Sequence, residues 1–219
     1  MSSFMKIAVV LLLLAVAVVQ TQGAHASSSL TTASTKDASA TFDTNVGDVR
    51  TSVDVVVSET EVTSPEGTQR GLHADIEILQ FDPRIGTYGR MIDVAGGVDT
   101  QPGGFDLRQD LSNASLDLTI AVCGAKVLHN GRLKQRAFDT CFDAHVSLQW
   151  TGTGEVTSAS GTDEYQAGDC TVDVASGYSR RLSLASGTIS AGAVNFTPGD
   201  SMTSSISAST RSTAATCPD

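Results

Sequence analysis

Apolar and polar residues alternate along several segments of this chain. The clearest are 53–57, 116–122, 146–150 and 172–174, and residues 74–81 and 181–185 have a similar composition. A period of two places one set of side chains in a core and the other toward water, as in antiparallel sheets. Clusters of Ser, Thr, Gly and Asp between these segments suit turns. No segment after residue 26 keeps a helical period, so the pattern predicts an all-β protein.

One apolar run stands outside this pattern. Ile7 to Val19 follows the single cation Lys6 and precedes the small-x-small sequence Ala24-His25-Ala26. This is the layout of a secretory signal peptide, with cleavage after Ala26. A membrane-spanning helix needs about 20 apolar residues, so an uncleaved anchor is the weaker alternative. The sequence predicts a secreted or cell-surface protein with 1–26 removed and no membrane span left.

The segment 27–40 is rich in Ser, Thr and Ala and shows no period. That composition is typical of flexible linkers. We therefore expect a flexible leader between the signal peptide and the first strand.

Four landmarks occur twice in the same order, the second set 94 to 96 residues after the first. Phe-Asp-Thr recurs at 42–44 and 138–140, Glu-Val-Thr-Ser at 61–64 and 155–158, Ala-Gly-x-Val at 95–98 and 191–194, and a cysteine at 123 and 217. Several matches in register indicate an internal duplication. The expected fold is two homologous antiparallel β-sandwich-like units, 41–124 and 138–219, joined by a hairpin at 125–137.

The linking segment holds the pair Asn130-Gly131, which favours a two-residue hairpin turn because both central positions need positive φ. A turn there would place Cys123 opposite Phe138 and three positions away from Cys141. Bridged Cα atoms must lie within about 7 Å, so this register disfavours a bond between those cysteines unless the hairpin bulges or ends early.

The cysteines indicate disulfides rather than a metal site. Cys123, Cys141, Cys170 and Cys217 are an even number in an exported chain, and no pair has C-x-x-C spacing. Three connectivities are open. The sequence favours Cys141–Cys170 with Cys123–Cys217, because the second bond would join equivalent positions of the two copies.

The chain is acidic, with 14 Lys and Arg against 24 Asp and Glu, a net charge of −10. Loss of Lys6 with the signal peptide leaves 13 against 24, or −11. This balance disfavours non-specific binding to nucleic acid or anionic lipid. Arg132, Lys134 and Arg136 share one face of the linking hairpin and could bind an anionic partner, although charges that protect an edge strand are the favoured alternative.

No catalytic, cofactor-binding or metal-ligating residue is assigned. His73, His129 and His145 lie in no nucleophile motif, and Ser176 to Ser179 does not form the elbow of a hydrolase. Trp150 continues an apolar face, so we expect it in the core rather than in a sugar-binding platform.

The densest carboxylates lie in and beside an expected loop at 158–168. They are Asp163, Glu164, Asp169 and Asp173. A calcium site would need six to eight oxygen ligands, and no calcium-loop pattern accompanies them. A solvated acidic loop is the favoured interpretation. Asn113 and Asn195 begin N-glycosylation sequons, which matter only in a eukaryotic secretory host.

Three short segments in the second half carry a resemblance. They are Val146–Thr153 (VSLQWTGT), Ser179–Gly187 (SRRLSLASG) and Asn195-Phe196-Thr197-Pro198. Together they resemble exported bacterial proteins of unknown function. The resemblance implies a β-sandwich and export, and no activity.

The sequence therefore favours a non-enzymatic secreted or cell-surface protein with a binding or structural role and an unknown extracellular partner. One alternative is a small secreted hydrolase, which would gather a nucleophile or paired carboxylates in a cleft. A second is a calcium-stabilised adhesion module, which would bring Asp163, Glu164 and Asp169 together.

Overall fold

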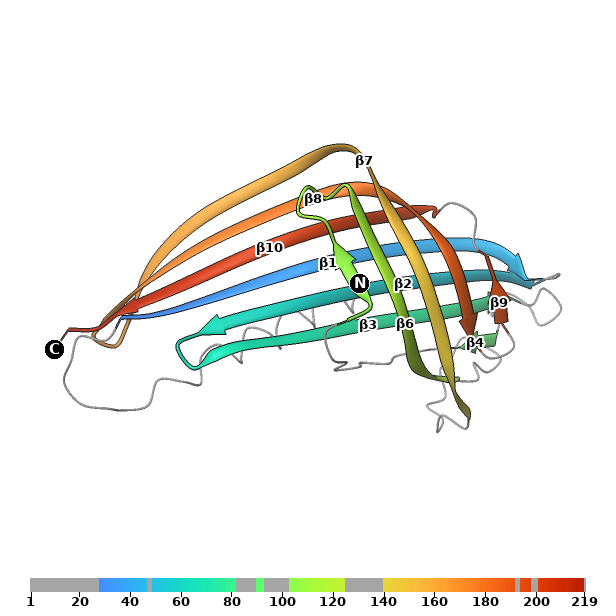
Figure 1. Cartoon of the computed structure of the whole chain (residues 1–219), viewed down its shortest axis with the longest axis horizontal. Helices are drawn as coiled ribbons and strands as arrows, with labels where there is room; N and C mark the ends of the chain where they lie inside the picture. The colour runs from blue at the N-terminus through green and yellow to red at the C-terminus, as the bar shows by residue number, and fades with distance from the viewer. Residues whose placement is uncertain are drawn as a thin grey trace.

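The computed structural model describes residues 28–46, 49–81, 90–92, 103–124, 140–191, 194–197 and 201–218. These residues form ten β-strands and no helix, which confirms the all-β prediction (Figure 1). The strands are β1 (Ser28–Val46), β2 (Val49–Ser64), β3 (Gly67–Phe81), β4 (Arg90–Ile92), β5 (Phe105–Leu107), β6 (Asn113–Gly124), β7 (Thr140–Ala167), β8 (Cys170–Ala191), β9 (Val194–Phe196) and β10 (Thr203–Thr216). The expected signal peptide and linking hairpin lie outside the described residues. Across the part of the chain that the structure describes, no helix has the length and apolar character needed to cross a membrane.

All ten strands belong to one antiparallel sheet in the order β4-β3-β2-β1-β10-β8-β7-β6-β5, with β9 paired to β8. The first and last long strands are neighbours, because Leu30 of β1 pairs with Ala214 of β10 and Thr41 pairs with Thr203. The two expected units therefore share one sheet. Backbone hydrogen bonds between β1 and β10 join the two halves of the chain into one sheet.

The expected flexible leader is wrong, because 28–40 forms most of β1 in the middle of the sheet. Ala38, Ala40 and Phe42 alternate with polar residues and are buried in the core. Two of these three side chains are only a methyl group, so the alternation is weak in the sequence. The strand is held by neighbours on both sides rather than by its own composition.

The internal duplication is not confirmed. Glu61-Val62-Thr63-Ser64 ends β2 at a tight turn, where Ser64 pairs with Gly67. Its counterpart Glu155–Ser158 lies within β7, at an irregularity in the strand. The repeated sequence thus occupies two different kinds of position in the fold.

The core lies where the sheet folds across itself. β6 and the first half of β7 cross over β1, β2 and β3 (Figure 1). Side chains from both layers form one buried cluster, which includes Val55, Ile76, Ile120 and Leu148. Trp150 is completely buried, as expected, and its indole Nε1 donates a hydrogen bond to the carbonyl of Ser39 at 3.0 Å. This bond ties the two layers together.

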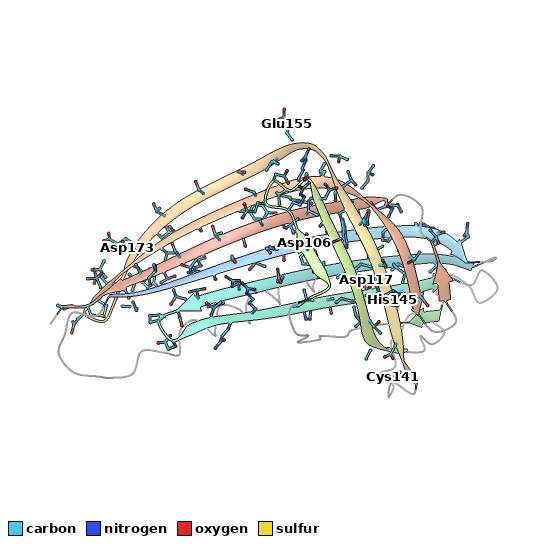
Figure 2. The ribbon with its side chains drawn as sticks, in the orientation of Figure 1. Asp106, Asp117, Cys141, His145, Glu155 and Asp173 are labelled. Carbon is cyan, nitrogen blue, oxygen red and sulfur yellow. A yellow bond between two sulfur atoms is a disulfide. The ribbon has the colours of Figure 1, made fainter. Side chains whose placement is uncertain are left out.

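A bulge in β7 bends the strand and lets its first half cross the sheet. Thr153 pairs with Leu182 and Thr157 pairs with Arg180, so residues 154–156 all face the single residue Arg181. Extra residues on one strand bend it sharply, and Gly154 adopts φ 68°, which suits glycine. Arg181 Nε donates to the Gly154 carbonyl at 3.0 Å. β7 bends at this point, with Glu155 at its apex (Figure 2).

Beyond this corner the sheet continues as a single layer, here called the sheet extension. It consists of 157–167 of β7, 170–180 of β8, 207–216 of β10, 28–37 of β1, 60–64 of β2 and 67–71 of β3. Before the corner, β7 alternates between buried and exposed residues, whereas every residue of 154–169 is exposed. Both faces of the sheet extension near β7 therefore meet water. We call the face that continues the core side the inner face, and the other the outer face.

The cysteines pair differently from the expectation. Cys170 and Cys217 form a disulfide, so Cys141–Cys170 and Cys123–Cys217 are both wrong. Thr171 of β8 pairs with Thr216 of β10, which places these two cysteines opposite each other at the end of the sheet extension. The bond closes the tip of the two strands.

The register between β6 and β7 explains the rest of the error. Cys123 pairs with Cys141 and Gly124 with Thr140, a register shifted by three positions from the one that a two-residue turn at Asn130-Gly131 would set. Cys141 is disulfide-bonded, and no described cysteine is free. The backbone thus brings together two cysteines that the assumed turn would have kept three positions apart.

Candidate functional site

A shallow groove runs across the inner face of the sheet extension. Its larger part, about 410 Å³, lies over β7, β8 and β10, and its smaller part, about 290 Å³, reaches β1. The inner-face side chains that line it are Ser158, Ser160, Ser179, Ala175, Ala208, Thr210, Ser212 and Thr32, together with Gly177. All are small, and most carry a hydroxyl group.

The strand register puts these residues in rows across the sheet. Ser158 pairs with Ser179, and Ser160 pairs with Gly177, which in turn pairs with Thr210. Alternate residues of a strand share a face, so these rows form the floor of the groove. Ser158 and Ser179 share a hydrogen bond of 2.8 Å between their Oγ atoms.

Gly177 lies in both parts of the groove. A Cβ atom placed there would come within 3.1 Å of Thr210 Oγ1 and would fill the space between the two parts. No charged side chain lines the larger part. The groove therefore suits a neutral polar ligand that exchanges hydrogen bonds with hydroxyl groups and lies flat on the sheet.

The outer face carries a half-buried carboxylate. Asp37 of β1 lies between Ser58 of β2 and Ser207 of β10 in the register. Burial raises the pKa of Asp37, and hydrogen bonds from Ser58 and Ser207 oppose the rise. The Ser207 hydroxyl lies 3.5 Å from the carboxylate, so this bond is weak.

His73 and His145 each lie beside a carboxylate. His73 Nε2 is 2.8 Å from Asp75 Oδ2, and Ser58 faces His73 across the strands. His145 Nε2 is 3.8 Å from Asp117 Oδ1, too far for a hydrogen bond (Figure 2). Neither histidine lines the groove. Side-chain exposures of 43% for His73 and 52% for His145 place both on the exposed surface of the sheet.

The acidic residues do not gather as a calcium site would require. The expected loop at 158–168 is wrong, because β7 continues to Ala167 and the turn holds only Gly168 and Asp169. Glu164 pairs with Asp173, whereas Asp163 pairs with Val174 and so lies on the other face. Among the described residues, no three acidic, histidine or cysteine side chains are placed to hold a metal ion.

Other residues identified in the sequence lie away from the groove or outside the described residues. Arg132, Lys134 and Arg136 lie outside the described residues, as does His129. Tyr165 is exposed, and the register places it with Val172 on the outer face of the sheet extension. Asn113 begins β6 with an exposed side chain.

The groove itself could not be found from the sequence. Residues 157–162 read Thr-Ser-Ala-Ser-Gly-Thr, which lacks the apolar alternation that marks a half-buried strand. The signal for a loop and the signal for a strand with both faces in water are the same. Only the pairing with β8 distinguishes them.

Comparison with known proteins gives little further information. No family model matches the chain, and no curated protein matches it. A structural match is the crystal structure described as a "putative AttH" from Nitrosomonas europaea, with 11% identity and a TM-score of 0.32. The match covers 85% of this chain and 52% of that one, so this chain spans about half the length of that protein. A likeness at this level carries no argument about fold or function.

Proposed function

We propose that this protein is a secreted, non-enzymatic binding protein whose ligand lies in the groove on the inner face of the sheet extension. The observation that carries the proposal is the exposure of 154–169 on both faces of a long strand. A strand that buries nothing contributes little to a core, so its long, regular surface is available for recognition.

The lining favours a neutral, hydroxyl-bearing chain such as a glycan. Serine and threonine hydroxyls both donate and accept, as sugar hydroxyls do. The larger part of the groove has no charged side chain to select an ion. The shallow floor, continuous across Gly177, fits an extended ligand better than a compact one.

A steric variant tests the groove. Gly177→Val should fill the floor, while valine is a good strand residue and Gly177 does not have a positive φ that would strain it. Gly71→Val is the matched control, because a Cβ at Gly71 meets nothing within 4 Å and Gly71 lies on β3, away from the groove. Binding to a panel of neutral polysaccharides should fall at least tenfold for the first variant, about 1.4 kcal/mol, and stay unchanged for the second.

Two results would count against the proposal. One is glycan binding that is equal in both variants. The other is hydrolysis of ester or glycoside substrates that is lost in Ser58→Ala or His73→Ala, since that would favour the hydrolase alternative at the His73–Asp75 pair.

A further inference from the structure

β7 has an open backbone edge along the sheet extension. β6 pairs with β7 only as far as Thr151, which lies opposite Asn113. From 157 to 167, β8 lies on one side, and no described strand pairs with the other side. Figure 1 shows this half of β7 as the outermost ribbon of the sheet.

The turn that follows β7 identifies the open backbone groups. Ala167 pairs with Cys170 across the two-residue turn Gly168-Asp169, so this closing pair exchanges hydrogen bonds with β8. Hydrogen-bonded and non-hydrogen-bonded pairs then alternate along the antiparallel ladder. The even-numbered residues from Ser158 to Gln166 therefore direct their N–H and C=O groups away from β8.

This edge has little of the usual protection against pairing, since Asp163 and Glu164 are the charged residues of 157–167. Proteins protect open edges with proline, lysine or a bulge, and 157–167 contains no proline, lysine or arginine. The bulge at 154–156 comes before the open stretch. The Cys170–Cys217 disulfide closes the tip next to it, so the edge is already formed in a single copy.

We propose that two copies of this chain pair through residues 157–165 of β7, antiparallel about a two-fold axis at Gly161. This arrangement places Ser160 opposite Thr162, and Ser158 opposite Glu164. The even-numbered residues then face each other, as their outward N–H and C=O groups require. Asp163 faces Ala159, so no carboxylate meets another, and the self-complementary contact closes as a dimer. This interface uses the backbone edge of β7, whereas the groove lies on the inner face of the sheet extension; Ser158 and Ser160 belong to both.

The second copy has to overcome repulsion between two molecules with a net charge of −10. Salt screens exposed charges, so association should strengthen as the ionic strength rises from about 0.1 M to about 1 M. A basic peptide on the same edge would show the opposite dependence. The salt response therefore distinguishes a second copy from a cationic partner.

Sedimentation equilibrium of the secreted protein over a range of concentrations tests the proposal. The double variant Ser160→Glu with Thr162→Glu places carboxylates opposite each other twice, and the dissociation constant of the dimer should rise about tenfold or more. Ser186→Glu with Thr188→Glu, two exposed positions of β8 opposite the first half of β7, adds the same charge away from the edge, is the control and should leave association unchanged.

A backbone variant checks the same edge without added charge. Thr162→Pro removes one outward N–H but no hydrogen bond to β8, so the monomer should keep its circular dichroism spectrum while the dimer weakens. A protein that is monomeric at every concentration and salt level would overturn the proposal. So would a dimer that both edge variants leave intact.

Discussion

Three buried serines show how this small core accommodates polar groups. Ser183, Ser201 and Ser204 are all below 9% exposed. The Ser204 hydroxyl lies 3.0 Å from each of the other two hydroxyls, and Ser201 Oγ accepts a bond from the Ala185 amide at 2.8 Å. Because these hydroxyl groups are hydrogen-bonded, their burial carries only a small desolvation penalty. The bonds hold the start of β10 against β8.

Trp150 connects the two layers by burial and by a hydrogen bond. Trp150→Ala should lower the free energy of unfolding by about 3–5 kcal/mol, because it leaves a large cavity and removes the bond to the Ser39 carbonyl. Urea unfolding measures the loss. Tyr178→Ala, at an exposed position, should change stability by less than about 1 kcal/mol. Equal losses in the two variants would contradict the assigned role of Trp150.

Asp37 should make stability depend on pH. Its folded-state pKa lies above 3.8, the ordinary value for aspartate, so the folded protein holds more protons than the unfolded chain as the pH rises from 3.8 to the folded pKa. The free energy of unfolding therefore falls through that window. Asp37→Asn should gain stability relative to the native protein as the pH rises, measured by urea unfolding at several pH values.

Asp43 provides a control of opposite sign. Its hydrogen bond with Arg50 lowers the pKa of Asp43, so its contribution is lost as the pH falls through the folded pKa. Asp43→Asn should lose stability relative to the native protein as the pH rises toward neutral. Parallel pH profiles for the two variants would show that neither shift acts as described.

At the scale of a strand, the corner in β7 separates two environments. Before residue 153 the strand alternates and builds the core, and after residue 157 it is exposed on both faces. Arg181 spans the irregularity through its bond to the Gly154 carbonyl. A single side chain from β8 thus holds the position where β7 changes direction.

Arg181→Met should loosen this corner while keeping the apolar stem of the side chain. We expect a loss of about 1–2 kcal/mol and faster amide exchange in 154–160, because the carbonyl loses a charge-assisted bond. Hydrogen exchange with mass spectrometry localises the effect. Arg180→Met, on the exposed neighbour, is the control; the same exchange pattern in both variants would rule out the bond as the cause.

Strands with large aliphatic residues could be predicted from the sequence. Valines 53, 55 and 57 are fully buried in β2, and the alternation at 114–120 matches β6. β1 and the second half of β7 were missed because their period is carried by Ala, Ser and Thr, which are also typical of loops. Their strand structure comes from long-range pairing, which a local pattern does not contain.

At the scale of the molecule, the sheet has a core at one end and a single layer at the other. Tertiary burial stabilises the first part. The second depends on its backbone ladder, on the disulfide at its tip and on the smaller buried area of Val172 and Val174. The sequence could not show this division, because the pairing of the first strand with the last decides it.

Removal of the tip disulfide should therefore affect one part more than the other. The bond closes a separation of 47 residues, for which loop entropy suggests about 4 kcal/mol. Cys170→Ala with Cys217→Ala should accelerate amide exchange in 157–180 and 207–216. The amides of 144–150 should exchange almost as slowly as in the native protein. Uniform acceleration across all these segments would show instead that the sheet unfolds as one unit.

The exposure of 154–169 on both faces has a consequence for how this chain tolerates change. Side chains there fill no interior space, so most exchanges that keep a strand-forming residue should leave folding intact. The chemistry displayed on this part of the sheet can vary independently of the scaffold. The core end of the sheet thus acts as a stable scaffold, and residues 154–169 form a surface whose side chains can be substituted without loss of the fold.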